Sequence, residues 1–205
     1  MDSISRLAAL FEKLPGIGPR QARRFVQYLL STSPGVRTEL ADLIKRLGAD
    51  SRQCVKCYRW YAKNSSAGEL CSICANPARE AAILFVVEKD ADIENVERSG
   101  FRGMYFVLGG TIALATEEPE KFVRIRELMR RVEEDASQLL LNELILGLSA
   151  TTEGDHTREI LMEKLRPLSE GLNFRVSSLG RGLSTGSELE YADPDTIAQA
   201  LGNRH

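Results

Sequence analysis

The stretch Ala81-Ala82-Ile83-Leu84-Phe85-Val86-Val87-Glu88 decides the fold class of this 205-residue chain. Its seven consecutive apolar residues are too few to cross a bilayer, which takes about 20, and they fit a strand that is buried on both faces. A helix is expected next, over about 90–99, followed by a second strand over Gly103–Leu108. This order predicts a parallel βαβ unit, with Glu88 at the carboxyl edge, where such sheets place their ligand groups.

The alternation of strands and helices continues beyond this unit. We expect a charged helix over about 118–135, an apolar strand near Leu144–Leu148, a helix over 155–170 and a strand at Asn173–Ser177. Connections of this length favour parallel pairing, with the helices packed on the sheet. The part of the chain after residue 79 is therefore predicted to be an α/β domain with a mainly parallel sheet.

The N-terminal part of the chain is predicted to be helical instead. Apolar side chains recur at intervals of three and four residues in three segments before residue 50, which predicts three helices. The break Leu14-Pro15-Gly16-Ile17-Gly18-Pro19 separates the first two and is typical of a helix-hairpin-helix. Gly16 and Gly18 would let a phosphate approach the backbone closely, and the free N–H groups that open the next helix would hold the anion.

Three arginines, Arg20, Arg23 and Arg24, follow this break directly. Their spacing places all three guanidinium groups on one face of the second helix, beside the glycine loop. Such a face would bind phosphates and read no base edge. Together with Gly16 and Gly18, it predicts a site for a polyanion that is indifferent to base identity. The alternative is a plain helical hairpin with a solvated basic face.

The charge distribution favours a polyanionic partner for the N-terminal part. Residues 1–60 carry 11 Lys and Arg against 5 Asp and Glu, whereas the other residues carry 16 against 24, so the net charge is only −2. An apolar content of 43% is enough for a core and excludes overall disorder. No signal-like or membrane-spanning segment is visible, which predicts a cytoplasmic protein with no membrane partner.

All four cysteines lie close together, as two C-x-x-C pairs separated by 13 residues. This spacing is typical of a tetrahedral zinc site with four thiolate ligands and no open position, so we expect structural zinc. The alternative is a cluster of buried free thiols. We also expect loss of the metal to destabilise the N-terminal half of the chain. The predicted ligands are Cys54, Cys57, Cys71 and Cys74.

Three carboxylates are predicted at the carboxyl edge of the parallel sheet. Glu88 ends its strand, and Glu153 and Asp155 follow the strand near Leu144–Leu148 with one glycine between them. Together they could hold Mg²⁺, whereas a solvated helix cap is the alternative for a single acid. The sequence contains no phosphate-binding P-loop motif and no Ser/His/Asp set, so nothing indicates a P-loop ATPase or a nucleophilic hydrolase.

The order of these features resembles the RecR family of bacterial recombination mediators over essentially the whole chain. The features that carry the resemblance are the helix-hairpin-helix, the four cysteines, the strand that ends in Val86-Val87-Glu88, the Glu153-Gly154-Asp155 signature and the segment Gly186–Asp193. Their order along the chain is more specific than any one of them.

The resemblance implies a multi-module α+β protein whose parallel sheet belongs to a Toprim domain. It also implies a short Walker-B-like tail that contains Glu188, Glu190 and Asp193. We therefore expect four parts, which are a helix-hairpin-helix DNA-binding region (1–50), a four-cysteine zinc finger (51–78), the Toprim domain (79–178) and the C-terminal tail (179–205).

The resemblance further implies a function in DNA repair. RecR proteins form ring-shaped homo-oligomers that clamp DNA, join RecO or RecF, and help to load recombinase onto single-stranded DNA, so the chain is expected near the nucleoid. They are not known for catalysis, which leaves the three carboxylates as a non-catalytic Mg²⁺ site or a partner surface. Arg20 and Arg24 match DNA-facing positions of the family, which implies sequence-independent binding to double- and single-stranded DNA. The alternatives are a Mg²⁺-dependent Toprim nuclease or nucleotidyl transferase, and an adaptor that binds only proteins.

Overall fold

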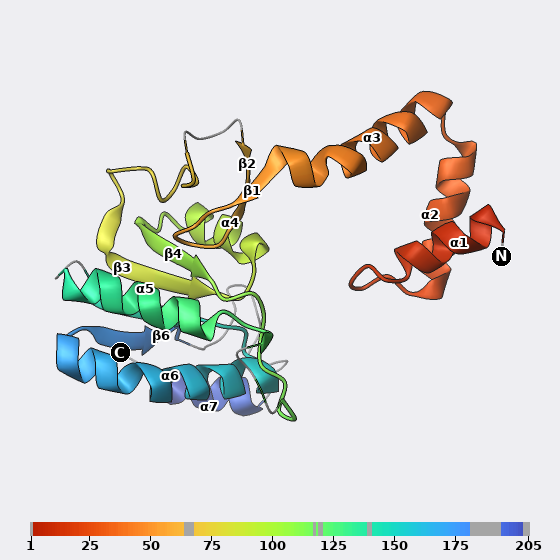
Figure 1. Cartoon of the computed structure of the whole chain (residues 1–205). Helices are drawn as coiled ribbons and strands as arrows, with labels where there is room; N and C mark the ends of the chain where they lie inside the picture. The colour runs from red at the N-terminus through yellow and green to blue at the C-terminus, as the bar shows by residue number, and fades with distance from the viewer. Residues whose placement is uncertain are drawn as a thin grey trace. The chain divides into compact units, whose positions relative to one another are not determined.

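The computed structural model describes residues 2–63, 68–116, 118, 121–138, 141–180 and 194–202 (Figure 1). The chain divides into two compact units, Met1–Ser51 and Arg52–His205. The tail residues expected to carry acidic side chains, Glu188, Glu190 and Asp193, lie outside the described residues. Among the described helices, none is long and apolar enough to cross a membrane.

The first unit consists of three helices, α1 (Ser3–Phe11), α2 (Pro19–Ser31) and α3 (Pro34–Asp50). Its fully buried side chains are small and come from the contact of α1 with α2: Ala8, Ala22 and Val26. Around them pack the partly buried side chains of Leu7, Phe11 and Ile17.

Helix α3 buries none of its residues. It begins at an N-cap serine, Ser33, whose hydroxyl accepts a hydrogen bond from the N–H of Val36 at 3.5 Å. Its large apolar side chains recur at helical spacing on one side and remain exposed, namely Val36, Leu40, Leu43, Ile44 and Leu47. The first unit therefore combines a small core with a large apolar surface.

The second unit is built on a four-stranded parallel sheet in the order β4-β3-β5-β6. Residues Phe85, Tyr105 and Ile145 lie in register across its three longest strands. The predicted α+β architecture with a parallel sheet is confirmed. Its elements are β3 (Glu80–Val87), α4 (Asp90–Arg98), β4 (Gly103–Val107), α5 (Ile125–Ser137), β5 (Glu143–Gly147), α6 (Thr152–Leu172) and β6 (Arg175–Ser178).

Both faces of the sheet are covered, as the unbroken apolar run of β3 predicts. Leu84 and Val86 join a large core with residues of α5 and α6, which Figure 1 shows side by side along the sheet. Phe85 and Val87 point to the opposite face and share a second core with Ile93 of α4. The carboxyl ends of β3 and β5 are thereby held between two packed layers.

Four elements differ from the sequence-based expectation. A small hairpin, β1 (Ser51–Gln53) with β2 (Trp60–Ala62), was not expected, and neither was α7 (Pro194–Gly202). Helix α5 begins at Ile125 rather than near residue 118. The residue before it, Arg124, uses its backbone N–H to bind the carbonyl of Leu108 at 2.9 Å, so a tertiary contact sets the start of this helix.

Candidate functional site

The glycine loop between α1 and α2 leaves the start of α2 open. Gly16 has a φ of +78°, which favours glycine. Gly18 is the N-cap of α2, and no side chain caps the helix there. A Cβ atom added to Gly18 would meet no atom within 4 Å, and its φ of −88° suits any residue. The fold of the unit itself therefore does not require glycine at position 18.

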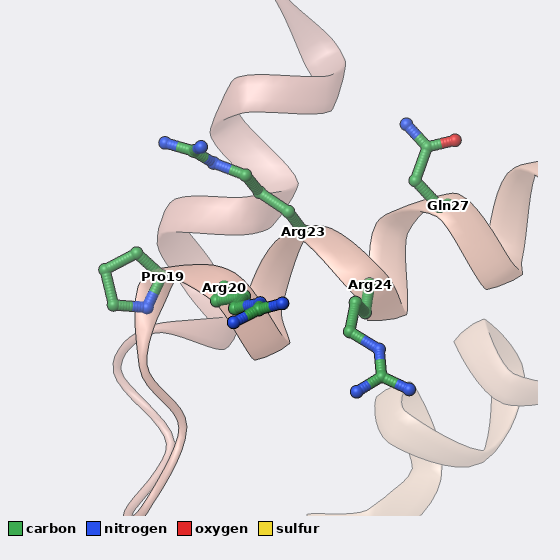
Figure 2. Close-up of a pocket in the computed structure, with 5 residues that line it drawn as sticks. All are labelled: Pro19, Arg20, Arg23, Arg24 and Gln27. Carbon is green, nitrogen blue, oxygen red and sulfur yellow. The ribbon is translucent and has the colours of Figure 1, made fainter.

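The first turns of α2 carry a surface that we call the arginine face. Its residues line a shallow hollow of about 750 Å³, and Figure 2 shows their side chains spreading from successive turns of the helix. Among the described residues, none forms a hydrogen bond or ion pair with the three guanidinium groups, and α2 contains no acidic residue. The face consists of Pro19, Arg20, Arg23, Arg24 and Gln27.

The far end of α2 is held by an arginine that sequence reasoning did not single out. Arg37 of α3 donates from Nη1 to the carbonyl oxygens of Leu29 at 3.0 Å and Thr32 at 2.7 Å. These bonds satisfy carbonyls that a helix end leaves without partners. Its position just after the second helix was the only signal in the sequence, since basic side chains often bind the last carbonyls of a helix.

The four predicted metal ligands do come together. The Sγ atoms of Cys54, Cys57, Cys71 and Cys74 all lie within 4.8 Å of one another, and three of the four residues are buried. The Sγ atoms of Cys57 and Cys71 are 3.6 Å apart, close to the separation of about 3.8 Å that follows from tetrahedral zinc with Zn–S bonds of about 2.3 Å. The N–H of Cys71 also donates to the Sγ of Cys54 at 3.4 Å. The donor set thus fits a metal ion that prefers four thiolates.

The cysteine cluster belongs to the second unit. Three of the cysteines share the core of Phe85, Val87 and Tyr105 on one face of the sheet. The carbonyl of Cys57 accepts a hydrogen bond from the N–H of Val107 in β4 at 2.8 Å. That loss of the metal destabilises the N-terminal half stays a prediction. Because the cysteines pack on the parallel sheet, we expect the effect within the second unit rather than in α1–α3.

Two further contacts fasten the first cysteine pair to helix α5. Arg131 donates from Nη1 to the carbonyl of Lys56 at 2.8 Å and forms a buried ion pair with Asp135 at 2.5 Å. Tyr58 has a φ of +63°, an uncommon conformation for a residue with a side chain. Its hydroxyl accepts from Arg130 at 3.0 Å, and its ring packs edge-on against Phe106. Tertiary contacts thus hold this strained residue in place.

The three predicted carboxylates each have a partner of their own. Glu88 is buried, with 8% of its surface exposed, and accepts from the backbone N–H of Ser149 at 2.5 Å. Glu153 accepts from the hydroxyl of Thr111 at 3.3 Å, and Asp155 pairs with Arg158 at 2.9 Å. Among the described residues, only the four cysteines form a group of three or more side chains close enough to hold a metal ion. The structure does not bring the three acids together in this way.

The glycine between the two acids has a packing role. Gly154 lies buried in the first turn of α6, and a Cβ atom there would be 2.1 Å from the carbonyl oxygen of Ser149. Its N–H donates to the hydroxyl of the N-cap residue, Thr151, at 3.1 Å. The Glu-Gly-Asp spacing therefore lets the start of α6 press against the loop that follows β5.

A polar cluster, not predicted from the sequence, joins Arg79, just before β3, to α4 and β4. Arg79 donates to the carboxylate of Glu97 at 2.7 Å and to the carbonyl of Gly103 at 2.6 Å, and the hydroxyl of Tyr105 donates to Glu97 at 2.6 Å. Burial and the bond to Glu97 raise the pKa of Tyr105. Burial acts to raise the pKa of Glu97, but the bonds from Arg79 and Tyr105 outweigh it and lower that pKa.

Comparisons with known proteins match three parts of the chain to known families. Residues 4–47 match the family described as RecR, helix-hairpin-helix, residues 82–178 match the Toprim domain, and residues 182–205 match RecR, C-terminal. The recombination protein RecR of Chloroflexus aurantiacus is 38% identical over 202 residues, which covers 98% of this chain and 93% of the relative.

Two further relatives show the same coverage. The recombination protein RecR of Rubrobacter xylanophilus is 36% identical over 204 residues, 98% of this chain and 96% of the relative. That of Cereibacter sphaeroides is 39% identical over 203 residues, 98% of this chain and 95% of the relative. At this identity over nearly the full length, the chain belongs to the RecR family of recombination proteins.

Proposed function

We propose that this protein is a non-enzymatic DNA clamp in recombinational repair, which binds DNA through the arginine face and helps to load recombinase onto single strands. The observation that carries the proposal is the arginine face itself. Arg20, Arg23 and Arg24 have no acidic partner among the described residues and lie on a helix without acidic side chains. A folded protein gains little from three uncompensated positive charges on one face, so an external polyanion is their natural partner.

The glycine loop supports a phosphate site next to these arginines. Pro19 has no N–H, and the N–H groups that follow it in the first turn of α2 meet no side-chain cap. The positive end of the helix dipole is exposed at the start of α2, and it attracts an anion. Because Gly18 is not required by the fold, its missing side chain is best explained by the close approach of a ligand. Such a site holds the backbone of DNA and is indifferent to its sequence.

We further propose that the cysteine cluster binds one zinc ion. Four thiolates are the preferred ligand set of structural zinc, and they leave no open position for a substrate. Cys54 and Cys57 carry the turn that contacts β4, whereas Cys71 and Cys74 come from a separate turn of the chain. When bound, the ion would cross-link these two turns and so fix the segment that covers one face of the sheet.

A second copy of the chain is the proposed partner for the exposed side of α3. The first unit buries three small side chains, which is little for a compact unit of its size. Leu40, Leu43 and Leu47 repeat at intervals of three and four residues, a pattern that packs well against a copy of itself. A contact of α3 with itself closes a dimer, and a ring that clamps DNA would join such dimers through a second contact.

The acidic edge is proposed as a surface for partner proteins of the RecO or RecF type. Glu153 is exposed and Asp155 half-buried at the start of α6, where a basic protein surface could reach both. Each acid already has a partner within the fold, and the sequence offers no nucleophile, which favours recognition over catalysis. The alternative is a Mg²⁺-dependent Toprim nuclease, for which Glu153→Gln should abolish strand cleavage.

The experiment that tests the proposal compares DNA binding by the wild type and by the double variant Arg20→Ala, Arg24→Ala. A matched control removes two exposed arginines of the second unit, Arg98 and Arg175, so that the net charge changes equally. We expect the control to bind DNA as the wild type does and the test variant to bind far more weakly. Equal binding by all three proteins would refute the arginine face as the DNA site.

A further inference from the structure

An aromatic side chain, Tyr28, lies exposed one helical turn beyond Arg24 on α2. Its exposed fraction is 62%, which is high for a tyrosine, and among the described residues its hydroxyl has no hydrogen-bond partner. Residues four apart lie on neighbouring positions of a helix surface, so Tyr28 borders the arginine face on the side of Arg24. The apolar side of α2, with Ala22 and Val26, points elsewhere.

The backbone that carries Tyr28 is held firmly. Its carbonyl oxygen accepts from the N–H of Thr32 at 3.0 Å and from the hydroxyl of Ser31 at 3.0 Å. Arg37 bonds to the neighbouring carbonyls of Leu29 and Thr32. A helix end normally frays because its last carbonyls have no hydrogen-bond partners. At the end of α2 these carbonyls do have partners, so fraying is opposed. The exposed ring is therefore presented from a rigid backbone.

The arginine face and Tyr28 together form a track along α2. From Arg20 to Tyr28 the helix rises about 12 Å, with Arg24 midway and Gln27 between them. Positive charges next to an aromatic ring suit a single strand of DNA, because its phosphates and the flat faces of its bases are both accessible. In a duplex the bases are stacked inside the double helix, so a tyrosine ring on the surface of α2 cannot reach their faces.

We propose that Tyr28 stacks on an unpaired base of single-stranded DNA while Arg20 and Arg24 hold the neighbouring phosphates, so that this face prefers single strands to duplex. The inference rests on the proposed DNA binding and adds to it a preference of this face for single-stranded over duplex DNA. Stacking depends on the ring and not on the hydroxyl, and it tolerates any base because every base has a flat face. The preference is therefore independent of sequence.

The test measures the affinity of Tyr28→Ala, Tyr28→Phe and the wild type by fluorescence anisotropy. Three labelled ligands with equal numbers of phosphates are used: oligothymidylate, the same strand with abasic sites, and a duplex. Phe122→Ala is the matched control, because Phe122 is 70% exposed in the second unit and takes no part in the track. Native mass measurement of each variant checks that the assembly is unchanged.

We expect Tyr28→Ala to weaken binding to oligothymidylate by roughly 5- to 150-fold, the range for the removal of one base stack. Binding to the abasic strand and to the duplex should not change, and neither should the dependence of affinity on salt, since no charge is removed. Tyr28→Phe and Phe122→Ala should bind all three ligands as the wild type does.

Three results would overturn the inference. If Tyr28→Ala weakens binding to all three ligands alike, or changes none of them, the ring does not stack on a base. If Tyr28→Ala changes the mass of the assembly, the ring belongs to a contact between subunits. Failure of the underlying DNA site is recognised separately, because Arg20→Ala with Arg24→Ala would then leave binding to every ligand unchanged.

Discussion

The two units of this protein differ in what they bury and what they expose. The first unit buries Ala8, Ala22 and Val26 and exposes apolar side chains on α3. The arginines at the start of its helix α2 have no partner among the described residues. The second unit covers both faces of a parallel sheet, and its charged side chains Arg79, Glu97 and Arg131 are paired. From this difference we expect the first unit to contact other molecules and the second unit, with its larger cores, to supply most of the stability.

The largest expected effect is the loss of stability of the second unit when the metal is removed. Removal of the ion by chelation, or the change Cys57→Ser, should destabilise the second unit, because the cysteines share its core and hold β4 through Val107. We expect a decrease in stability of about 4 kcal/mol, which lowers the Tm of this unit by roughly 8–16 °C. Hydrogen exchange resolved by residue checks this. Faster exchange confined to α1 and α2 would reverse the assignment of the metal to the second unit.

A charge on the apolar side of α3 should disrupt assembly rather than folding. Leu43→Glu places a carboxylate among the exposed apolar side chains, and we expect the native mass to fall to that of smaller assemblies while the helix content is kept. Lys45→Glu is the control, because Lys45 lies on the opposite side of the same helix. An unchanged native mass for Leu43→Glu would show that α3 is not a contact between copies.

The two units should also respond oppositely to the same substitution. Gly154→Ala forces a Cβ atom against the backbone of Ser149 and should destabilise the second unit by about 1–3 kcal/mol. Gly48→Ala meets no atom within 4 Å in α3 and should stabilise the first unit by about 0.5–1 kcal/mol. Chemical denaturation of both variants checks the signs. Equal effects would mean that the packing at Gly154 is loose.

The smallest expected effect is a pH dependence of the second unit. Because the pKa of Glu97 is lowered in the folded protein, its contribution is present above the unfolded pKa of about 4.3 and is lost as the pH falls through the folded pKa. The difference in Tm between the wild type and Glu97→Gln should therefore be largest near neutral pH and shrink below about pH 4. A difference that grows on acidification would contradict the role of the bonds from Arg79 and Tyr105.

Local patterns in the sequence predicted those parts of the fold that depend on neighbours along the chain. Three such patterns are the apolar run of β3, the break from Leu14 to Pro19 and the paired cysteines. The structure contains the corresponding strand, the helical hairpin of α1 and α2, and the cysteine cluster. The three-residue strands β1 and β2 are too short for a visible alternation. The start of α5 depends on Arg124 bonding to Leu108, an interaction that no local pattern reveals.

For the candidate site, too, the sequence predicted the features that depend on residues close together in the chain. Spacing alone puts Arg20, Arg23 and Arg24 on one helix face, so the arginine face could be foreseen. Residue spacing could not show that Glu88 bonds to Ser149, nor that the carboxylates of Glu153 and Asp155 have separate partners. The bonds of Glu88 and Glu153 join residues far apart in the chain and depend on how the helices pack on the sheet.

The central claim, that the arginine face binds the DNA backbone without reading bases, is tested most directly by a salt titration. The affinities of the wild type and of Arg20→Ala, Arg24→Ala are measured for several unrelated single strands and duplexes. The account predicts equal affinity across sequences and a dependence of log affinity on log salt that is flatter in the variant by about 0.7–0.9 for each phosphate that the protein no longer neutralises. Equal slopes and equal affinities for the two proteins would contradict it.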